Sequence, residues 1–167
     1  MKKQVSVVMG SDSDLSVMRE CLQALEKFDL PYEVQILSAH RLPEETADFA
    51  KNAADRGIDV IIAGAGGAAH LAGVIAAVTP LPVIAVPLKN SSLGGIDALY
   101  AMVQMPRGIP VATVAVDGAY NAGILAAQII GVKEVQVRER VLAYKKELAN
   151  QVKKKNERLQ TLGYKNY

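Results

Sequence analysis

The hydrophobic residues of this chain follow two alternating patterns. Short unbroken apolar runs, rich in valine and isoleucine, alternate with longer stretches in which apolar residues return every three or four positions. Unbroken runs are typical of parallel strands buried on both faces, and the wider spacing is typical of helices with one buried face. The predicted strands span residues 5–9, 32–37, 60–63, 83–86 and 111–116. The predicted helices span residues 15–28, 43–56, 68–78, 96–103 and 119–130.

This alternation of strand and helix predicts the fold class. It indicates an α/β protein with a doubly wound parallel sheet, in which helices cover both faces and give three α/β/α layers. Crossovers between parallel strands are right-handed, so the carboxyl ends of the strands meet at one edge. Ligands of such sheets bind at that edge, and we expect the functional residues there.

A long helical pattern follows, from about residue 133 to residue 159. Its apolar residues form one stripe, which consists of Val137, Val141, Tyr144, Leu148 and Val152. No strand follows this pattern. We therefore predict an α/β domain with the functional edge over residues 1–132. Residues 133–167 are predicted to form a helical extension whose stripe packs on neighbouring subunits of a homo-oligomer.

Charge is distributed unevenly along the 167 residues. The net charge is +2, but residues 133–167 carry +6 and the preceding part carries −4. The basic side chains lie within the helical pattern, with acids between them, and no aromatic platform for nucleic-acid bases accompanies them. We therefore expect a solvated helix face and no nucleic-acid partner.

The composition also bears on where the protein works. A single cysteine, Cys21, excludes an internal disulfide framework and suits a reducing compartment. Cys21 falls in a helical pattern, and we expect it in the core. No apolar run reaches the ~18 residues that a membrane-spanning helix needs, and no targeting segment is recognised. These features predict a cytoplasmic protein with no membrane partner.

Residues 10–14, with the sequence Gly-Ser-Asp-Ser-Asp, stand between the first strand and the first helix. Gly10 permits a tight turn there, and Ser11 or Asp12 can cap the helix. The free backbone N–H groups of this turn and the helix dipole also favour an anion such as a phosphate. Both interpretations, a phosphate seat and a simple N-cap, fit these residues.

Residues 38–41, with the sequence Ser-Ala-His-Arg, end the second strand, and Pro43 opens the following helix. This tetrapeptide combines a hydroxyl, a proton carrier in His40 and a guanidinium fork in Arg41 that suits phosphate. The chain has only two histidines, His40 and His70. Any imidazole chemistry must therefore use one of them, although a purely structural role for His40 also fits.

A loop of small residues, 64–70, follows the third strand. Its first six residues fit the glycine pattern of dinucleotide-binding loops. That pattern belongs after the first strand of its unit and needs an acidic residue about twenty positions later, where this chain has Val-Pro-Leu. We therefore expect no dinucleotide, and instead a loop that lets backbone approach a flat ligand. A fourth cluster, residues 104–110, precedes the fifth strand at the opposite edge. It could complete a site only in a neighbouring chain.

These four motifs, in this order, resemble the 5-(carboxyamino)imidazole ribonucleotide mutase family over about residues 4–130. A second class in that family, the aminoimidazole ribonucleotide carboxylases, takes CO2 directly. Its members carry lysine after the histidine and lack the Gly-Gly-Ala-Ala-His loop. Arg41 and residues 66–70 place this chain with the mutases. Residues 116–121 depart from the family pattern, because this stretch beside the predicted site is shorter.

The resemblance implies a flavodoxin-like fold, a homo-octamer, and an isomerase of de novo purine biosynthesis without metal or cofactor. Such an enzyme moves the carboxyl group of 5-(carboxyamino)imidazole ribonucleotide from the exocyclic nitrogen to the neighbouring ring carbon, giving 5-amino-1-(5-phospho-D-ribosyl)imidazole-4-carboxylate. It works by decarboxylation and recarboxylation, with His40 as acid and base. The implied ligands of the small-molecule ribonucleotide are Ser11, Ser13, Ser38 and Arg41 at the phosphate, Asp14 at the ribose hydroxyls, and Gly66, Gly67, Ala68, His70 and Leu71 around the imidazole and carboxylate. His70 is expected to act through its backbone and packing.

Other interpretations stay open. An aminoimidazole ribonucleotide carboxylase that uses free CO2 is one of them. A carboxylase of a nicotinic acid nucleotide is expected to carry additional chain before the first strand. A flavodoxin-like signalling module would need a phosphoacceptor carboxylate at the end of the third strand, where this chain has Ala63 and Gly64.

Overall fold

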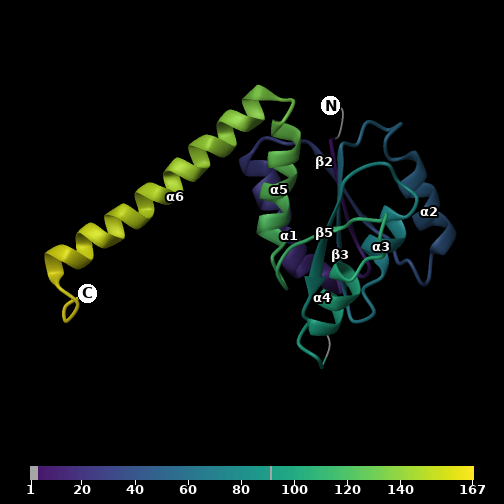
Figure 1. Cartoon of the computed structure of the whole chain (residues 1–167), viewed down its shortest axis with the longest axis horizontal. Coiled ribbons are helices and arrows are strands. Elements are labelled where there is room, and N and C mark those ends of the chain that lie inside the picture. Colours follow the sequence, from purple (N-terminus) through teal and green to yellow (C-terminus); the bar gives the residue numbers. More distant parts are fainter. Residues whose placement is uncertain (1–3, 91) are drawn as a thin grey trace.

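The computed structural model describes residues 4–90 and 92–167, and a five-stranded parallel sheet lies at its centre (Figure 1). The strand order is β2-β1-β3-β4-β5. The strands are β1 (Val5–Met9), β2 (Tyr32–Ile36), β3 (Val60–Gly66), β4 (Val83–Leu88) and β5 (Ala112–Thr113). All neighbouring strands pair in parallel, which confirms the predicted doubly wound α/β fold.

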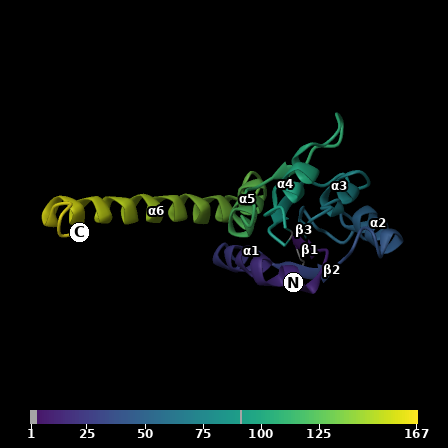
Figure 2. The same cartoon turned by 90° about the horizontal axis from the view of Figure 1, so that it is seen from below.

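Helices cover both faces of this sheet, as the second view shows (Figure 2). One face carries α1 (Leu15–Lys27) and α5 (Ala119–Gly131). The other carries α2 (Pro43–Asn52), α3 (Leu71–Ala76) and α4 (Ile96–Val103). A short 3-10 helix, η1 (Asp12–Asp14), precedes α1, and α6 (Val135–Leu162) ends the fold. Within the described residues, no helix is long and apolar enough to cross a membrane.

Side chains of the β1 strand alternate between two hydrophobic cores. Val5 and Val7 of β1 face the core under α1 and α5, whereas Val8 faces the core under α2, α3 and α4. Strand residues point to opposite faces in turn, so an unbroken apolar run fills both cores. Cys21 of α1 is fully buried in the first core, as predicted.

The fifth strand is shorter than predicted. Only Ala112–Thr113 form β5, although the sequence favours a strand over residues 111–116. The chain continues beside β4, where Val114 N donates to Ala85 O and Asp117 N donates to Pro87 O. Because Pro87 has no N–H, it cannot return a hydrogen bond, and the regular ladder stops before it.

The third helix also begins later than residue 68. The backbone of residues 67–70 forms tight turns instead, in which Ala69 N donates to Gly67 O and His70 N donates to Ala68 O. Gly67 has a φ of +61°, a conformation that glycine adopts without strain. Helix α3 therefore starts at Leu71, and the preceding residues remain free to shape the edge of the sheet.

The apolar stripe of α6 divides into two parts. Val137 and Val141 are buried in the core under α1 and α5, and the ring of Tyr144 packs edge-on against Phe28 at a centroid distance of 5.6 Å. The later stripe residues, Leu148 and Val152, are 42% and 66% exposed. The prediction that the whole stripe docks on a neighbour is therefore wrong for its first half, which packs on its own subunit. Beyond that half, α6 extends away from the sheet (Figure 1).

Candidate active site

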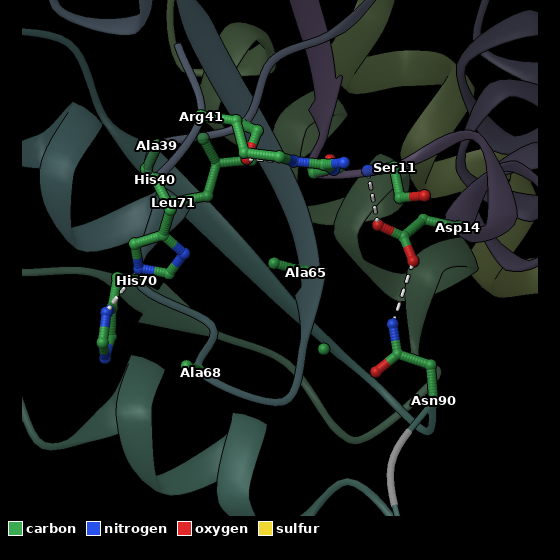
Figure 3. A pocket seen from close by; sticks show the side chains of 13 residues that line it. Ser11, Asp14, Ala39, His40, Arg41, Ala65, Ala68, His70, Leu71 and Asn90 are labelled. Atoms are coloured by element: carbon green, nitrogen blue, oxygen red, sulfur yellow. Dashed lines mark hydrogen bonds between the residues drawn. The ribbon is translucent and has the colours of Figure 1, made fainter. Parts of the chain in front are cut away.

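A cavity of about 330 Å³ lies at the carboxyl ends of strands β1 to β4 (Figure 3). Its walls come from the three motifs that follow the first three strands, and from the segment after β4. The lining residues are Gly10, Ser11, Asp14, Ser38, Ala39, His40, Arg41, Ala65, Gly66, Ala68, His70, Leu71 and Asn90. Every predicted site residue lies in this wall except Ser13 and Gly67, which are next to it in sequence.

The turn after β1 forms a capping box. Ser11 is the N-cap of η1: its Oγ accepts a hydrogen bond from Ser13 N at 3.4 Å, and its own N–H donates to Asp14 Oδ2 at 3.1 Å. Ser13 Oγ donates to Ser11 Oγ at 3.1 Å. The N-cap interpretation of this motif is therefore correct. The same turn lines the cavity, so capping leaves room for an anion there.

Asp14 is an acidic side chain held inside the site, with only 4% of its surface exposed. Burial raises the pKa of its carboxyl, and hydrogen bonds from Ser11, Asn90, Ser13 and Gly10 act in the opposite direction. Asn90 Nδ2 donates to Asp14 Oδ1 at 3.1 Å (Figure 3). The sequence motifs did not indicate Asn90. The available signal was its place two residues beyond β4, at the edge where the other residues that line the cavity lie.

Arg41 joins the ends of the first two strands. Its Nε donates to Ser38 Oγ at 3.2 Å, and its Nη2 donates to Gly10 O at 3.1 Å. A guanidinium has five N–H donors, so donors remain for a ligand. A second cavity, of about 430 Å³, shares Gly10, Ser11, Ser38 and Arg41 with the first. The positive charge of Arg41 therefore borders both spaces.

His40 and His70 face each other on the opposite side of the cavity from Asp14 (Figure 3). His40 Nε2 lies 2.9 Å from His70 Nδ1, and the ring planes are inclined by 83°. One of these nitrogens must carry the hydrogen and the other must accept it, so the tautomers of the two imidazoles are linked. The expectation that His70 acts only through backbone and packing leaves out a contact that the structure shows, because its ring lies within hydrogen-bond distance of His40.

Small residues bring the backbone at the end of β3 close to neighbouring side chains. A Cβ at Gly64 would fall 2.5 Å from Met18 Sδ, and a Cβ at Gly66 would overlap the side-chain amide of Asn90. Leu71, 3% exposed, closes the loop at the start of α3. The end of β3 can thus lie this close to Met18 and Asn90 because Gly64 and Gly66 have no side chains.

The fourth motif stands apart from this cavity. Residues 103 and 105–111 line a separate hollow of about 600 Å³, and none of them lines the cavity beside His40. This agrees with the expectation that the motif lies at the other edge of its own subunit.

A sequence model of the family described as AIR carboxylase matches residues 4–151. The chain belongs to the AIR carboxylase family. Among its relatives, the N5-carboxyaminoimidazole ribonucleotide mutase of Thermotoga maritima is 54% identical over 98% of this chain and 96% of its own length. The mutase of Pyrococcus horikoshii is 53% identical over 99% of this chain and 94% of its own length.

Two further comparisons show how much of each chain the similarity covers. The phosphoribosylaminoimidazole carboxylase of Schizosaccharomyces pombe is 50% identical over 98% of this chain, but the match spans only 30% of that protein. Among solved structures, Treponema denticola PurE has a TM-score of 0.85 with 29% identity and covers 94% of this chain and 98% of its own. The shared fold thus extends into the long C-terminal helix region of this chain.

Proposed function

We propose that this protein is a 5-(carboxyamino)imidazole ribonucleotide mutase. It moves the carboxyl group from the exocyclic nitrogen to the neighbouring ring carbon and yields 5-amino-1-(5-phospho-D-ribosyl)imidazole-4-carboxylate, a step of de novo purine biosynthesis. The observation that carries this proposal is the likeness to the mutases, which extends over nearly the full length of both chains at 50–54% identity. The carboxylases that match are more than three times as long as the matched segment.

The residues around the cavity fit a mutase better than an enzyme that takes free CO2. Arg41 follows the histidine, where carboxylases of the resembling class carry lysine, and residues 66–70 keep the Gly-Gly-Ala-Ala-His sequence. A signalling module is disfavoured, since β3 offers Ala63 and Gly64 where a phosphoacceptor would stand.

In the proposed reaction, the two ends of the cavity have different tasks. Ser11, Ser13, Ser38 and Arg41 hold the phosphate, and Asp14 accepts hydrogen bonds from the ribose. The base then reaches across to the histidine pair, and residues 66–71 flank the imidazole and its carboxylate. The span from Asp14 to His70 in Figure 3 suits a ligand with a polar sugar at one end and a reactive base at the other.

His40 carries the proton in both halves of the reaction. It first gives a proton to the exocyclic nitrogen as the N–C bond breaks and CO2 leaves. The ring carbon then attacks the retained CO2, and His40 takes the ring proton as aromaticity returns. The net change is an isomerisation, so one imidazole that gives and regains a proton closes the cycle. His70 bonds to the same ring and can hold His40 in a defined tautomer between the two steps.

The exposed part of α6 supports a proposal about assembly. Leu148 and Val152 leave an apolar stripe in water on a helix that extends from the sheet, and such a surface is stabilised by burial. We infer that residues 133–167 act as an extension that packs on neighbouring subunits of a homo-octamer in the cytoplasm.

A direct assay tests the catalytic proposal. His40→Asn is expected to bind the ribonucleotide but to lose turnover by several orders of magnitude, because the amide cannot exchange a proton. His70→Asn is expected to fall between this variant and the wild type, since an amide can still hydrogen-bond to His40. Mutase rates are measured by product absorbance, and binding is measured by calorimetry. A His40→Asn rate within tenfold of wild type would refute the role of His40.

A further inference from the structure

Asn90 lies in the wall of the cavity but belongs to none of the four sequence motifs. It follows β4, whose residues are all buried in the sheet, and it is the residue after this strand that lines the cavity. Its amide is oriented toward Asp14, on the side of the cavity away from the histidine pair (Figure 3). The proposed function gives this residue no task.

The hydrogen bond from Asn90 connects the Asp14 carboxylate to a segment that is distant in sequence. Asn90 Nδ2 donates to Asp14 Oδ1 across 76 positions of sequence at 3.1 Å. The other groups that hydrogen-bond this carboxylate, from Gly10, Ser11 and Ser13, belong to the same turn as Asp14 itself. Among the described residues, Asn90 therefore fixes the carboxylate relative to the rest of the sheet edge, whereas the turn fixes it only relative to its own backbone.

Gly66 leaves free the space that the Asn90 side chain occupies. A Cβ at Gly66 would occupy the space of the Asn90 side-chain amide, including its Oδ1, Cγ and Nδ2 atoms. An alanine at this position would therefore displace Asn90 and break its bond to Asp14. Gly66 and Asn90 act as one unit in this respect, because the glycine is needed for the asparagine to reach the carboxylate.

We propose that Asn90 is a positioning residue that aims the Asp14 carboxylate at the sugar of the ligand, and that it thereby determines preference for a ribonucleotide over a 2′-deoxyribonucleotide. This inference rests on the proposed function for the identity of the ligand. Ser11 N donates to Oδ2 and Asn90 Nδ2 donates to Oδ1, each at 3.1 Å, so the carboxylate is held at both of its oxygens and its orientation is fixed.

Two neighbouring sugar hydroxyls can satisfy a carboxylate held in this way, and a 2′-deoxy sugar leaves part of it unpaired. Sites built to hydrogen-bond a ligand hydroxyl reject the analogue that lacks it, because the buried polar group then loses its partner. Asp14 is almost wholly buried, so water replaces a missing hydroxyl poorly. If the carboxylate is free to turn, that penalty falls, and the preference for ribose falls with it.

The test measures binding of the product ribonucleotide, 5-amino-1-(5-phospho-D-ribosyl)imidazole-4-carboxylate, and of its 2′-deoxy analogue by calorimetry on the full-length protein. The variants are Asn90→Ala, Gly66→Ala and the double variant. Asn52→Ala is the matched control, since Asn52 makes one amide hydrogen bond to the backbone of its own helix, at Asp48 O. Asn90→Ala is expected to lower the ratio of the two affinities about tenfold, the size of one hydrogen bond to a charged group.

The pattern across variants separates positioning from a general structural effect. Gly66→Ala is expected to lower the ratio as Asn90→Ala does, and the double variant is expected to add nothing further. Asn52→Ala is expected to leave the ratio unchanged. Equal weakening of both ligands in Asn90→Ala, or no preference for ribose in the wild type, would overturn the proposal. So would a double variant in which the two effects multiply. If Gly66→Ala fails to fold, Asn90→Ala and the control decide the matter.

The binding test and the mutase assay together keep this inference separate from the proposed function. A wild-type protein without mutase turnover, but with a ribose preference that depends on Asn90, would refute the mutase assignment and support the role of Asn90. Full mutase turnover with a ribose preference unaffected by Asn90→Ala would support the mutase assignment and refute the role of Asn90.

Discussion

Replacing Arg41 by lysine tests whether this side chain reads the phosphate of the ligand. The guanidinium uses two N–H groups on the protein, at Ser38 Oγ and Gly10 O, and offers the others to the cavity. A lysine keeps the positive charge but has a single nitrogen, so it cannot bond to the two strand ends and grip a phosphate with a planar fork as well. The substitution therefore removes the planar fork of N–H donors but keeps the positive charge.

The expected loss follows from the number and exposure of these bonds. A hydrogen bond between a charged group and its partner contributes about 1.5–3 kcal/mol. Arg41 is exposed, so we take the lower end of that range for one lost phosphate contact. About 1.4 kcal/mol corresponds to a factor of ten in affinity. Arg41→Lys should therefore weaken binding of the ribonucleotide about tenfold, and it should change binding of the dephosphorylated nucleoside by less than about twofold.

Calorimetric titration of both ligands provides the measurement, and Arg56→Lys is the matched control. Arg56 also uses two nitrogens on the protein, at Phe49 O and Glu33 Oε1, and it does not line the cavity. Its replacement should leave both affinities unchanged. If Arg41→Lys weakens nucleotide and nucleoside equally, Arg41 orders the site without contacting the phosphate, and the reasoning is refuted.

Two further predictions concern the body of the protein. Removal of the chain after Ile130 deletes Val137 and Val141, whose burial contributes roughly 1.5–3 kcal/mol each, so this truncation should be strongly destabilised and prone to aggregate. Truncation after Leu148 keeps both valines and Tyr144, so this variant should fold with a nearly unchanged melting temperature while forming smaller oligomers. Thermal unfolding measures the stability of the two truncations, and light scattering measures their size. Equal stability of the two truncations would contradict this prediction. Burial raises the pKa of the Cys21 thiol to about 12, so the reactive thiolate is almost absent near neutral pH and a disulfide reagent should label Cys21 only as the protein unfolds. Rapid labelling of the native protein would show that α1 opens locally.

Much of the site was predictable because it follows from strand ends. In a parallel sheet the residues after each strand meet at one edge, so the motifs after β1, β2 and β3 had to converge. The unbroken apolar runs indicated parallel strands. A short apolar run bounded by polar turns can be buried on both sides only in a sheet that helices cover on both faces. These local signals sufficed to place Asp14, His40 and Arg41 around one cavity.

The features that escaped prediction depend on contacts between segments distant in sequence. The bond of Asn90 to Asp14 needs the rotamer of one residue and the absence of a Cβ at Gly66, and no periodicity records either. The ring of His70 meets His40 only because the tight turns of residues 67–70 aim it there. The stripe of α6 is continuous in sequence, but the direction in which α6 leaves α5 decides how far it stays on its own subunit.

The spread of the site over four strand ends has a consequence for how the protein matures. Arg41 reaches Gly10 across 31 positions, His40 reaches His70 across 30, and Asp14 reaches Asn90 across 76. During synthesis, β1 leaves the ribosome first but must wait for both β2 and β3 to flank it, and pairings between distant segments form slowly. A nascent chain that ends before β4 has the turn after β1 and both histidines, but it lacks the asparagine that ties Asp14 to the sheet edge. The wall of the cavity is therefore complete only after β4 has been synthesised, although β5, α5 and α6 still follow.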